Sequence, residues 1–130
     1  MRTTKRTLLL IVLATFILTS CKKDKEDPVI TVTTPAEHAE FALGATIHIE
    51  ATFEDDRELK SYTMEVGDSD GEHIVGFHFD DAGDISGKSY DYHTMVTMPD
   101  SLSVMMFYLH FTVTDEKGKT SSLKHMLHKM

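Results

Sequence analysis

The chain has 130 residues, a formal net charge of −8 at pH 7 and a single cysteine. This length fits one globular domain. The excess of acidic residues argues against a nucleic acid partner, because nucleic acids bind positive patches, and a single cysteine excludes an intramolecular disulfide.

Residues 1–20 have the pattern of a secretory signal peptide. Arg2, Lys5 and Arg6 give a basic start, and residues 8–18 are uncharged and mostly apolar. This run is about half as long as the roughly 20 apolar residues that a membrane-spanning helix needs. A short apolar run behind basic residues is typical of an export signal, so we expect residues 1–20 to be removed.

The predicted signal peptide is followed by a motif for lipid attachment. Leu18-Thr19-Ser20-Cys21 resembles the lipobox of bacterial lipoproteins, in which small residues precede an obligatory cysteine. The resemblance implies cleavage before Cys21, acylation of this residue (palmitate among the chains) and anchoring in the cell envelope, at either face of the outer membrane. Several acyl chains hold a protein more firmly than one. The alternative is an ordinary signal peptide that happens to precede a cysteine.

Residues 21–28 are predicted to form a flexible tether that starts at the lipidated Cys21. Residues 22–27 are all Lys, Asp or Glu, so this segment cannot bury apolar surface. The mixture also resembles the surface-export signals of Bacteroidetes lipoproteins, and a plain solvated linker is the alternative. Residues 1–20 hold three of the 13 Lys and Arg and no acidic residue, so the exported chain would carry a net charge of −11.

From Val29 onwards the hydrophobic pattern has a period of two, which is typical of half-buried strands. Ile47, Ile49 and Phe53 alternate with polar residues, and residues 105–113 show a similar alternation. The predicted strands are 29–33, 45–53, 59–66, 73–80, 89–98, 103–114 and 119–128. Seven short strands predict an all-β domain over residues 29–130, a seven-stranded Ig-like antiparallel β-sandwich.

Segments rich in Asp, Gly and Pro separate these strands at regular spacing, as turns require. Residues 81–84 (DAGD) are predicted to be one such turn. Residues 115–118 (DEKG) are predicted to close the hairpin between the last two strands, where Gly118 supplies the positive φ angle that hairpin turns often need.

Several motifs carry a resemblance to known families. They are Pro28-Val-Ile-Thr-Val, the Leu59-Lys-Ser-Tyr run behind Asp56, Ser86-Gly-Lys, and Thr-Asp115 with Gly three residues later. With these motifs the domain resembles cadherin-like and Ig-like domains of bacterial surface proteins. The whole chain resembles a family of small Bacteroidetes lipoproteins that have one such domain and no assigned function. The resemblance implies a membrane-anchored β-sandwich.

Eight histidines are the unusual feature of the composition, and His is the commonest protein ligand of transition metals. His48, His73, His78 and His93 are the candidate ligands. On a regular strand His73 and His78 point to opposite faces, unless a bulge at Gly76 turns them. His48 and His93 are expected to face outward from paired strands, as cross-strand neighbours. The alternative is that all four are solvated strand residues.

The last predicted hairpin carries further candidate surface residues. His110 and His125 pair if the register allows it. Met106 and Tyr108 are predicted to face outward, where they would contribute to an exposed apolar patch. Edge strands of such sandwiches also bind partners by strand addition.

Acidic segments predict turns more readily than calcium sites. Residues 68–72 resemble the first half of an EF-hand loop, but the twelfth position, which needs an acid, is Phe79. The acids at residues 54–56 would form a calcium site with Asp115 or Glu116, as between cadherin repeats, if a neighbouring domain completed it.

The sequence contains no Gly-x-Ser-x-Gly elbow, no Gly-rich phosphate loop and no His-Glu-x-x-His motif. We therefore do not expect an enzyme. The predicted function is a non-catalytic binding or accessory module, lipid-anchored in the cell envelope or at the cell surface, with a protein or a glycan as partner. The alternative is a His-based metal-binding or metal-delivery lipoprotein, with a transition metal as its cofactor.

Overall fold

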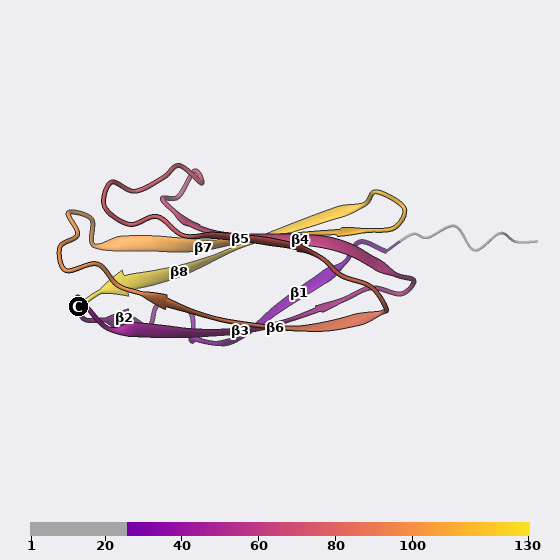
Figure 1. The fold of residues 1–130 in the computed structure, drawn as a ribbon, viewed down its shortest axis with the longest axis horizontal. Helices are drawn as coiled ribbons and strands as arrows, with labels where there is room; N and C mark the ends of the chain where they lie inside the picture. The colour runs from indigo at the N-terminus through magenta and orange to yellow at the C-terminus, as the bar shows by residue number, and fades with distance from the viewer. Residues whose placement is uncertain (1–25) are drawn as a thin grey trace, which may run out of the picture.

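The computed structural model describes residues 26–130, which form eight strands and no helix (Figure 1). The strands are β1 (Val29–Thr34), β2 (Glu40–Phe41), β3 (Thr46–Glu54), β4 (Leu59–Gly67), β5 (Asp80–Asp84), β6 (Ser89–Thr97), β7 (Met106–Asp115) and β8 (Thr120–Lys129). The predicted signal peptide and Cys21 lie outside the described residues. Within residues 26–130 no helix is long and apolar enough to cross a membrane.

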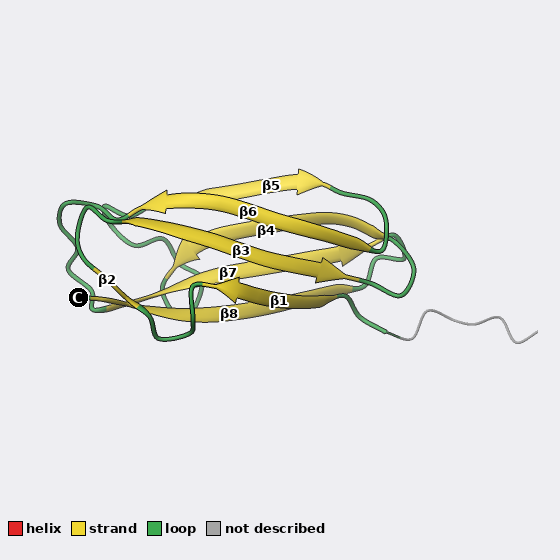
Figure 2. Ribbon diagram, turned by 90° about the horizontal axis from the view of Figure 1, so that it is seen from below, coloured by secondary structure: helices red, strands yellow, loops and turns green. Residues whose placement is uncertain are grey.

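The strands form two sheets that pack face to face in a sandwich-like arrangement (Figure 2). One sheet has three strands in the order β1-β3-β6, and the other has five in the order β2-β8-β7-β4-β5. Neighbouring strands are antiparallel except β2, which pairs parallel with β8. This parallel pair joins a segment near the start of the domain to its last strand.

The core lies between the two sheets because the period-two pattern turns one face of each strand inward. In β3 every second residue is buried, and Ile47, Ile49 and Phe53 have no exposed surface. In β7 Phe107, Leu109 and Val113 are equally buried and face them from the other sheet. The alternation read from the sequence therefore places the core correctly.

The sandwich has two ends that differ in their loops. We call the end where Val29 begins β1 the N-terminal end, and the opposite end, which carries Met130, the C-terminal end (Figure 1). The connections at the N-terminal end are residues 55–58, 85–88 and 116–119. The connections at the C-terminal end are residues 42–45, 68–79 and 98–105. The longer connections thus lie at the C-terminal end.

Six of the seven predicted strands are present within three residues of their expected bounds, but the strand at residues 73–80 is wrong. This segment is a loop that contains a tight turn, in which the Phe77 N–H donates to the Ile74 carbonyl at 3.0 Å and Gly76 has a φ of 82°. The left-handed conformation of Gly76 ends the extended chain there.

The predicted turn at residues 81–84 is also wrong, because these residues belong to β5. Their composition favours a turn, but pairing with β4, from Ser61 opposite Asp84 to Glu65 opposite Asp80, holds them extended. The short strand β2 was not expected, since two residues carry no periodicity and only their pairing with β8 defines them.

Candidate functional site

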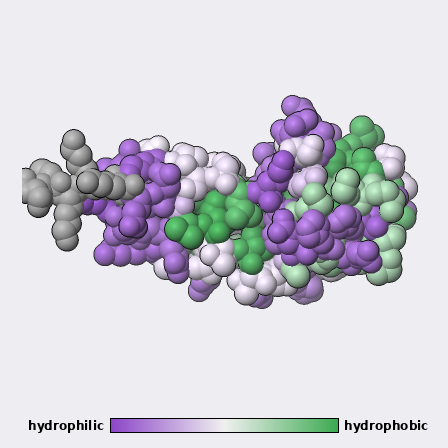
Figure 3. Space-filling view, turned by 180° about the vertical axis from the view of Figure 1, so that it is seen from behind, coloured by the Kyte–Doolittle hydropathy of each residue, from purple (hydrophilic) through white to green (hydrophobic). Residues whose placement is uncertain are grey.

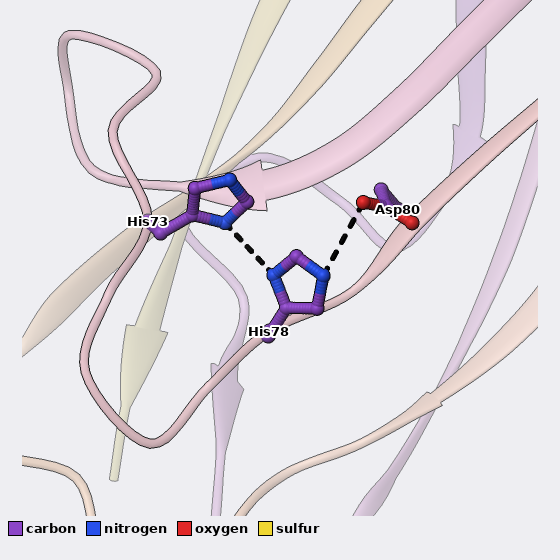
Figure 4. A network of polar contacts seen from close by, with 3 residues as sticks. All are labelled: His73, His78 and Asp80. Atoms are coloured by element: carbon purple, nitrogen blue, oxygen red, sulfur yellow. Dashed lines mark hydrogen bonds and ion pairs between the residues drawn. The ribbon is translucent and has the colours of Figure 1, made fainter.

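The loop before β5 brings His73 and His78 together (Figure 4). Their Nδ1 atoms are 2.8 Å apart, and the Nε2 atom of His78 lies 3.3 Å from the Oδ2 atom of Asp80. The tight turn at Gly76 is the cause, because it folds the chain back between the two histidines. The side chains of His78 and Asp80 are 61% and 64% exposed, so solutes can reach this pair.

The carboxylate of Asp80 gives the His73–His78 pair a defined chemistry. If Nε2 of His78 donates to Asp80, its Nδ1 is left as an acceptor toward His73. A carboxylate behind an imidazole is also the usual support of a metal-bound histidine. The pair supplies two facing ring nitrogens, one of them oriented by an acid.

His48 and His93 both lie exposed on the outer face of the three-stranded sheet, as expected. The register pairs His48 with Met95 and His93 with Glu50, so the two histidines are diagonal neighbours and not directly opposite each other. Their ring centroids are 6.5 Å apart. The structure therefore brings them near each other without the close approach seen for His73 and His78.

The expectation that His110 and His125 pair is wrong. The register of β7 and β8 places His125 opposite Leu109, on the inner face, while His110 lies opposite Lys124 on the outer face. Each instead contacts a backbone carbonyl: Nε2 of His110 donates to Asp68 at 2.7 Å, and Nε2 of His125, which is buried, donates to Pro35 at 2.8 Å. Since a carbonyl only accepts, both rings carry a proton on Nε2.

A third pair, His38 and His128, was not found by sequence reasoning. Nδ1 of His38 lies 3.3 Å from Nε2 of His128, and the ring centroids are 5.5 Å apart. The two residues are 90 positions apart in the chain, and the parallel pairing of β2 with β8 brings them together. No local motif could have shown this.

Asp55 and Asp115 close turns at the N-terminal end and do not join a ligand cluster. Oδ2 of Asp55 accepts from the N–H groups of Arg57 and Glu58 at 3.0 and 3.1 Å. Oδ1 of Asp115 accepts from the N–H groups of Lys117 and Lys119 at 2.8 and 2.9 Å. In each residue the other carboxylate oxygen is buried without a hydrogen-bond partner.

The acids of residues 54–56 therefore do not assemble with Asp115 into the calcium site considered above. Across the described part of the chain, no three His, Cys, Asp or Glu side chains converge as a metal-ligand set. Each close histidine pair offers two nitrogen ligands for a metal ion. Any further ligand must come from water or from a nearby side chain that rotates toward the ion.

A polar link joins the two sheets beside β5. Oδ2 of Asp81 accepts hydrogen bonds from the hydroxyl of Tyr62 on β4, at 3.2 Å, and from that of Tyr92 on β6, at 3.0 Å. Burial, with the Asp81 carboxylate as a further cause, raises the pKa of Tyr62 to about 12. The pKa of Tyr92 is also raised, first by burial and then by the hydrogen bond to Asp81. These groups stay neutral donors, so the link is structural.

Most of the exposed large apolar side chains lie at the C-terminal end, whereas Val29 (54% exposed) lies at the N-terminal end. Figure 3 shows hydrophobic surface at the end far from the N-terminal end and also midway along the molecule. Val75 is 92% exposed, Met105 58% and Met130 71%. Met106 and Leu43, at 47% and 42%, belong to the same end. We call these five residues the apolar end patch. The outward position predicted for Met106 is confirmed.

The chain matches the family described as a domain of unknown function, DUF4625, over residues 19–128. It belongs to this family. No curated protein shows significant similarity to the chain.

Solved structures similar to this chain show the fold alone. A catalytically inactive OgpA from Akkermansia muciniphila, solved with an O-glycopeptide (glycodrosocin) substrate, matches with a TM-score of 0.52 and 13% identity over 80% of this chain and 29% of its own. The sporulation control protein Spo0M from Bacillus subtilis matches with a TM-score of 0.52 and 9% identity over 80% of this chain and 49% of its own. This chain thus spans less than half of either protein.

Proposed function

We propose that this protein is a lipid-anchored, non-catalytic binding module of the bacterial cell envelope, of Bacteroidetes type. The basic start, the short apolar run and the lipobox-like Leu18-Thr-Ser-Cys21 support the anchor. The family match begins at residue 19, so Cys21 falls inside the shared region. A lipid on Cys21 would leave the domain outside the bilayer, joined to it by the charged segment 22–28.

The domain is proposed to be an Ig-like sandwich. The strand order is β1-β3-β6 in one sheet and β8-β7-β4-β5 in the other. This order corresponds to an Ig arrangement in which β8, β7 and β4 form the common three-stranded sheet and β5 is added at its edge, next to β4. The eight observed strands include β2, which splits off from β1 to pair with β8. Such domains commonly act as rigid supports for loops that bind.

The observation that carries the proposal is that the two ends of the domain differ. The chain enters β1 at the N-terminal end, so an anchor at Cys21 would hold that end toward the membrane. The apolar end patch lies at the opposite end, where Val75 and Met105 belong to the two long connections. Several exposed apolar side chains at one end of a strongly acidic domain favour an interaction surface there, and it would point away from the bilayer.

The partner is proposed to be another protein of the envelope. Methionine side chains are flexible and polarizable, which suits contact with apolar protein surface. Glycans bind instead to flat aromatic faces with many polar groups, and the apolar end patch contains no aromatic residue. The net charge also disfavours a polyanionic partner.

Cross-linking from defined positions in intact cells tests this function. A photoreactive amino acid placed at Val75 or Met105 should yield a discrete cross-linked protein, while the same amino acid at Lys117, exposed at the N-terminal end, should not. Equal labelling from all three positions, or labelling of bulk envelope proteins only, would count against the proposal. A product that carries carbohydrate alone would assign the surface to a glycan.

A second candidate function is metal binding, favoured by the close histidine pairs His73–His78 and His38–His128. The full chain, purified in detergent without a histidine tag, is stripped with a chelator and titrated with zinc or copper near pH 7. Stoichiometric binding supports this candidate. The absence of any saturable binding would end it.

A further inference from the structure

We propose that His38 and His128 form a binding site for a tetrahedral divalent ion of the zinc type, with Glu40 as the third protein ligand. The proposal rests on the second candidate function, metal binding, and assigns it to a place in the fold. The site lies beside the parallel pair β2–β8, on the outer face of the five-stranded sheet toward the C-terminal end.

The distance between the two rings matches a shared metal ion better than a hydrogen bond. Zinc lies about 2.0–2.1 Å from a histidine nitrogen, so two nitrogens on one tetrahedral ion lie about 3.3–3.4 Å apart. Nδ1 of His38 and Nε2 of His128 are 3.3 Å apart. A typical N–H donor and its acceptor lie closer, at about 2.9–3.0 Å.

The backbone holds both histidines in place. The His38 N–H donates to the carbonyl of Met126 at 2.8 Å, and the His128 N–H donates to the carbonyl of Ala39 at 2.9 Å. These two bonds clamp the segment before β2 onto β8. The backbones of the two histidines are therefore held side by side, and only the side-chain torsions remain to be fixed when a ligand binds.

His38 also adopts a strained backbone conformation. Its φ is 70°, and among the described residues it is the sole non-glycine residue with a positive φ. Such a conformation is uncommon for a residue with a side chain and concentrates at functional sites. In this conformation the exposed imidazole of His38 lies against His128 of β8.

Glu40 and Met106 flank His128 on its two sides. Glu40 is the register partner of His128 across the parallel pair, and it is exposed. Paired residues on adjacent strands lie on the same face. The Glu40 carboxylate does not converge with the two rings in this structure, so its side chain would have to rotate toward an ion held there. Two histidines, one glutamate and a water form a known zinc ligand set. Met106, the partner of His128 on β7, adds a soft thioether that a copper ion would prefer.

The His73–His78 pair is the competing candidate for the ion, and its geometry differs from that of His38 and His128. Its two nitrogens are 2.8 Å apart, an ordinary hydrogen-bond distance, and His78 is engaged by Asp80. Both residues belong to an exposed loop with a glycine turn. A two-histidine surface cluster of this kind tests whether any pair of imidazoles would bind the ion.

The test is zinc titration of the full chain in detergent, stripped of metal and without a histidine tag. Affinity is measured by competition with a chromophoric chelator. Cobalt, which gives strong visible absorption in tetrahedral sites, is the spectroscopic probe. His38→Asn keeps a residue that tolerates positive φ but removes the imidazole. We expect His38→Asn and His128→Asn each to lower zinc affinity by about tenfold or more and to abolish the tetrahedral cobalt spectrum.

The control variant is His93→Asn, an exposed imidazole of the other sheet whose ring centroid lies 6.5 Å from that of His48, and it should leave zinc affinity and the cobalt spectrum unchanged. His73→Asn breaks the competing pair and should lower zinc affinity less than His38→Asn does. Glu40→Gln should weaken binding less than loss of a histidine. Unchanged affinity in Glu40→Gln would overturn its assignment as a ligand. Zinc binding that survives His38→Asn and His128→Asn, or that falls equally in His73→Asn, would overturn this site while metal binding stands. Absence of zinc binding to the unaltered chain would overturn both. Circular dichroism confirms that each variant is folded.

Discussion

The two ends of the sandwich differ in how their polar groups are used. At the N-terminal end, buried carboxylates of Asp55 and Asp115 accept backbone N–H groups and close short turns. At the C-terminal end, the connections are long, Val75 is almost fully exposed, and His73 and His78 lie free of the core. Asp68 also accepts backbone N–H groups at the C-terminal end, but it is not fully buried. The ends therefore differ in the burial of the carboxylates that close their turns and in the exposure of their apolar and His side chains.

The largest effect is expected from Asp115→Ala at the N-terminal end. Asp115 is fully buried, and its carboxylate accepts two backbone N–H groups that the variant would leave without an acceptor. We expect the free energy of unfolding to fall by about 3 kcal/mol, measured by urea denaturation. Glu116→Ala, at an exposed neighbouring position, is the control and should change it little. A loss no larger in Asp115→Ala than in this control would contradict the structural role.

The next largest effect separates binding from stability. Val75→Asp places a charge in the apolar end patch, where the side chain is 92% exposed. We expect the free energy of unfolding to change by no more than about 0.5 kcal/mol. Capture of the partner by a photoreactive amino acid at Met105 should fall by about tenfold or more in this variant, as for a central interface residue. Unchanged capture would place the binding surface elsewhere.

Two glycines allow a direct comparison of the two ends, because both have a positive φ and open space where a Cβ would be added. They are Gly118, with φ +87°, in the β7–β8 turn and Gly76, with φ +82°, between His73 and His78. Replacement by Ala costs about 1 kcal/mol from backbone strain. We expect the free energy of unfolding, measured by urea denaturation, to fall by this amount in Gly118→Ala. It should fall less in Gly76→Ala, because the loop that contains Gly76 can rearrange. Equal losses would show that the loop is coupled to the core.

The smallest effect concerns the link between the sheets. Asp81→Asn removes the charge that contributes to the raised pKa of Tyr62, which is about 12. We expect this pKa to fall but to stay above 10.0, since burial is the larger cause. Ultraviolet absorbance during alkaline titration measures it, with Tyr62→Phe to assign the signal. A Tyr62 pKa that does not change would mean that the hydroxyl does not bond to Asp81 in solution.

The same tyrosines predict how stability depends on pH. A tyrosine with a raised pKa in the folded state stabilises that state fully below about pH 10, and the benefit is lost as pH rises toward about 12. As the pH rises from about 10 to about 12, the free energy of unfolding should therefore fall less in Tyr62→Phe than in the unaltered chain. Urea denaturation at each pH gives the comparison. An identical pH dependence in both proteins would contradict the raised pKa.

Much of the fold could be predicted because β-strand burial is a local pattern. Ile49 and Phe111 face inward because every second side chain along an extended strand points the same way. The hairpin at Gly118 was predictable for a similar reason, since its residues favour a turn on their own. The acid-rich β5 was missed because its extended conformation depends on pairing with β4, which composition does not record.

The candidate sites also divide into features that the local sequence predicts and features that depend on tertiary contacts. The sequence by itself determined the alternation that builds the core and the outward position of His48 and His93. Only the tertiary structure decided that His38 meets His128, since a parallel pairing between distant segments brings them within 3.3 Å. It also decided that His73 meets His78, because Gly76 turns the chain where the pattern predicted a strand. Local periodicity sets which way a side chain points, whereas contacts between distant segments depend on register.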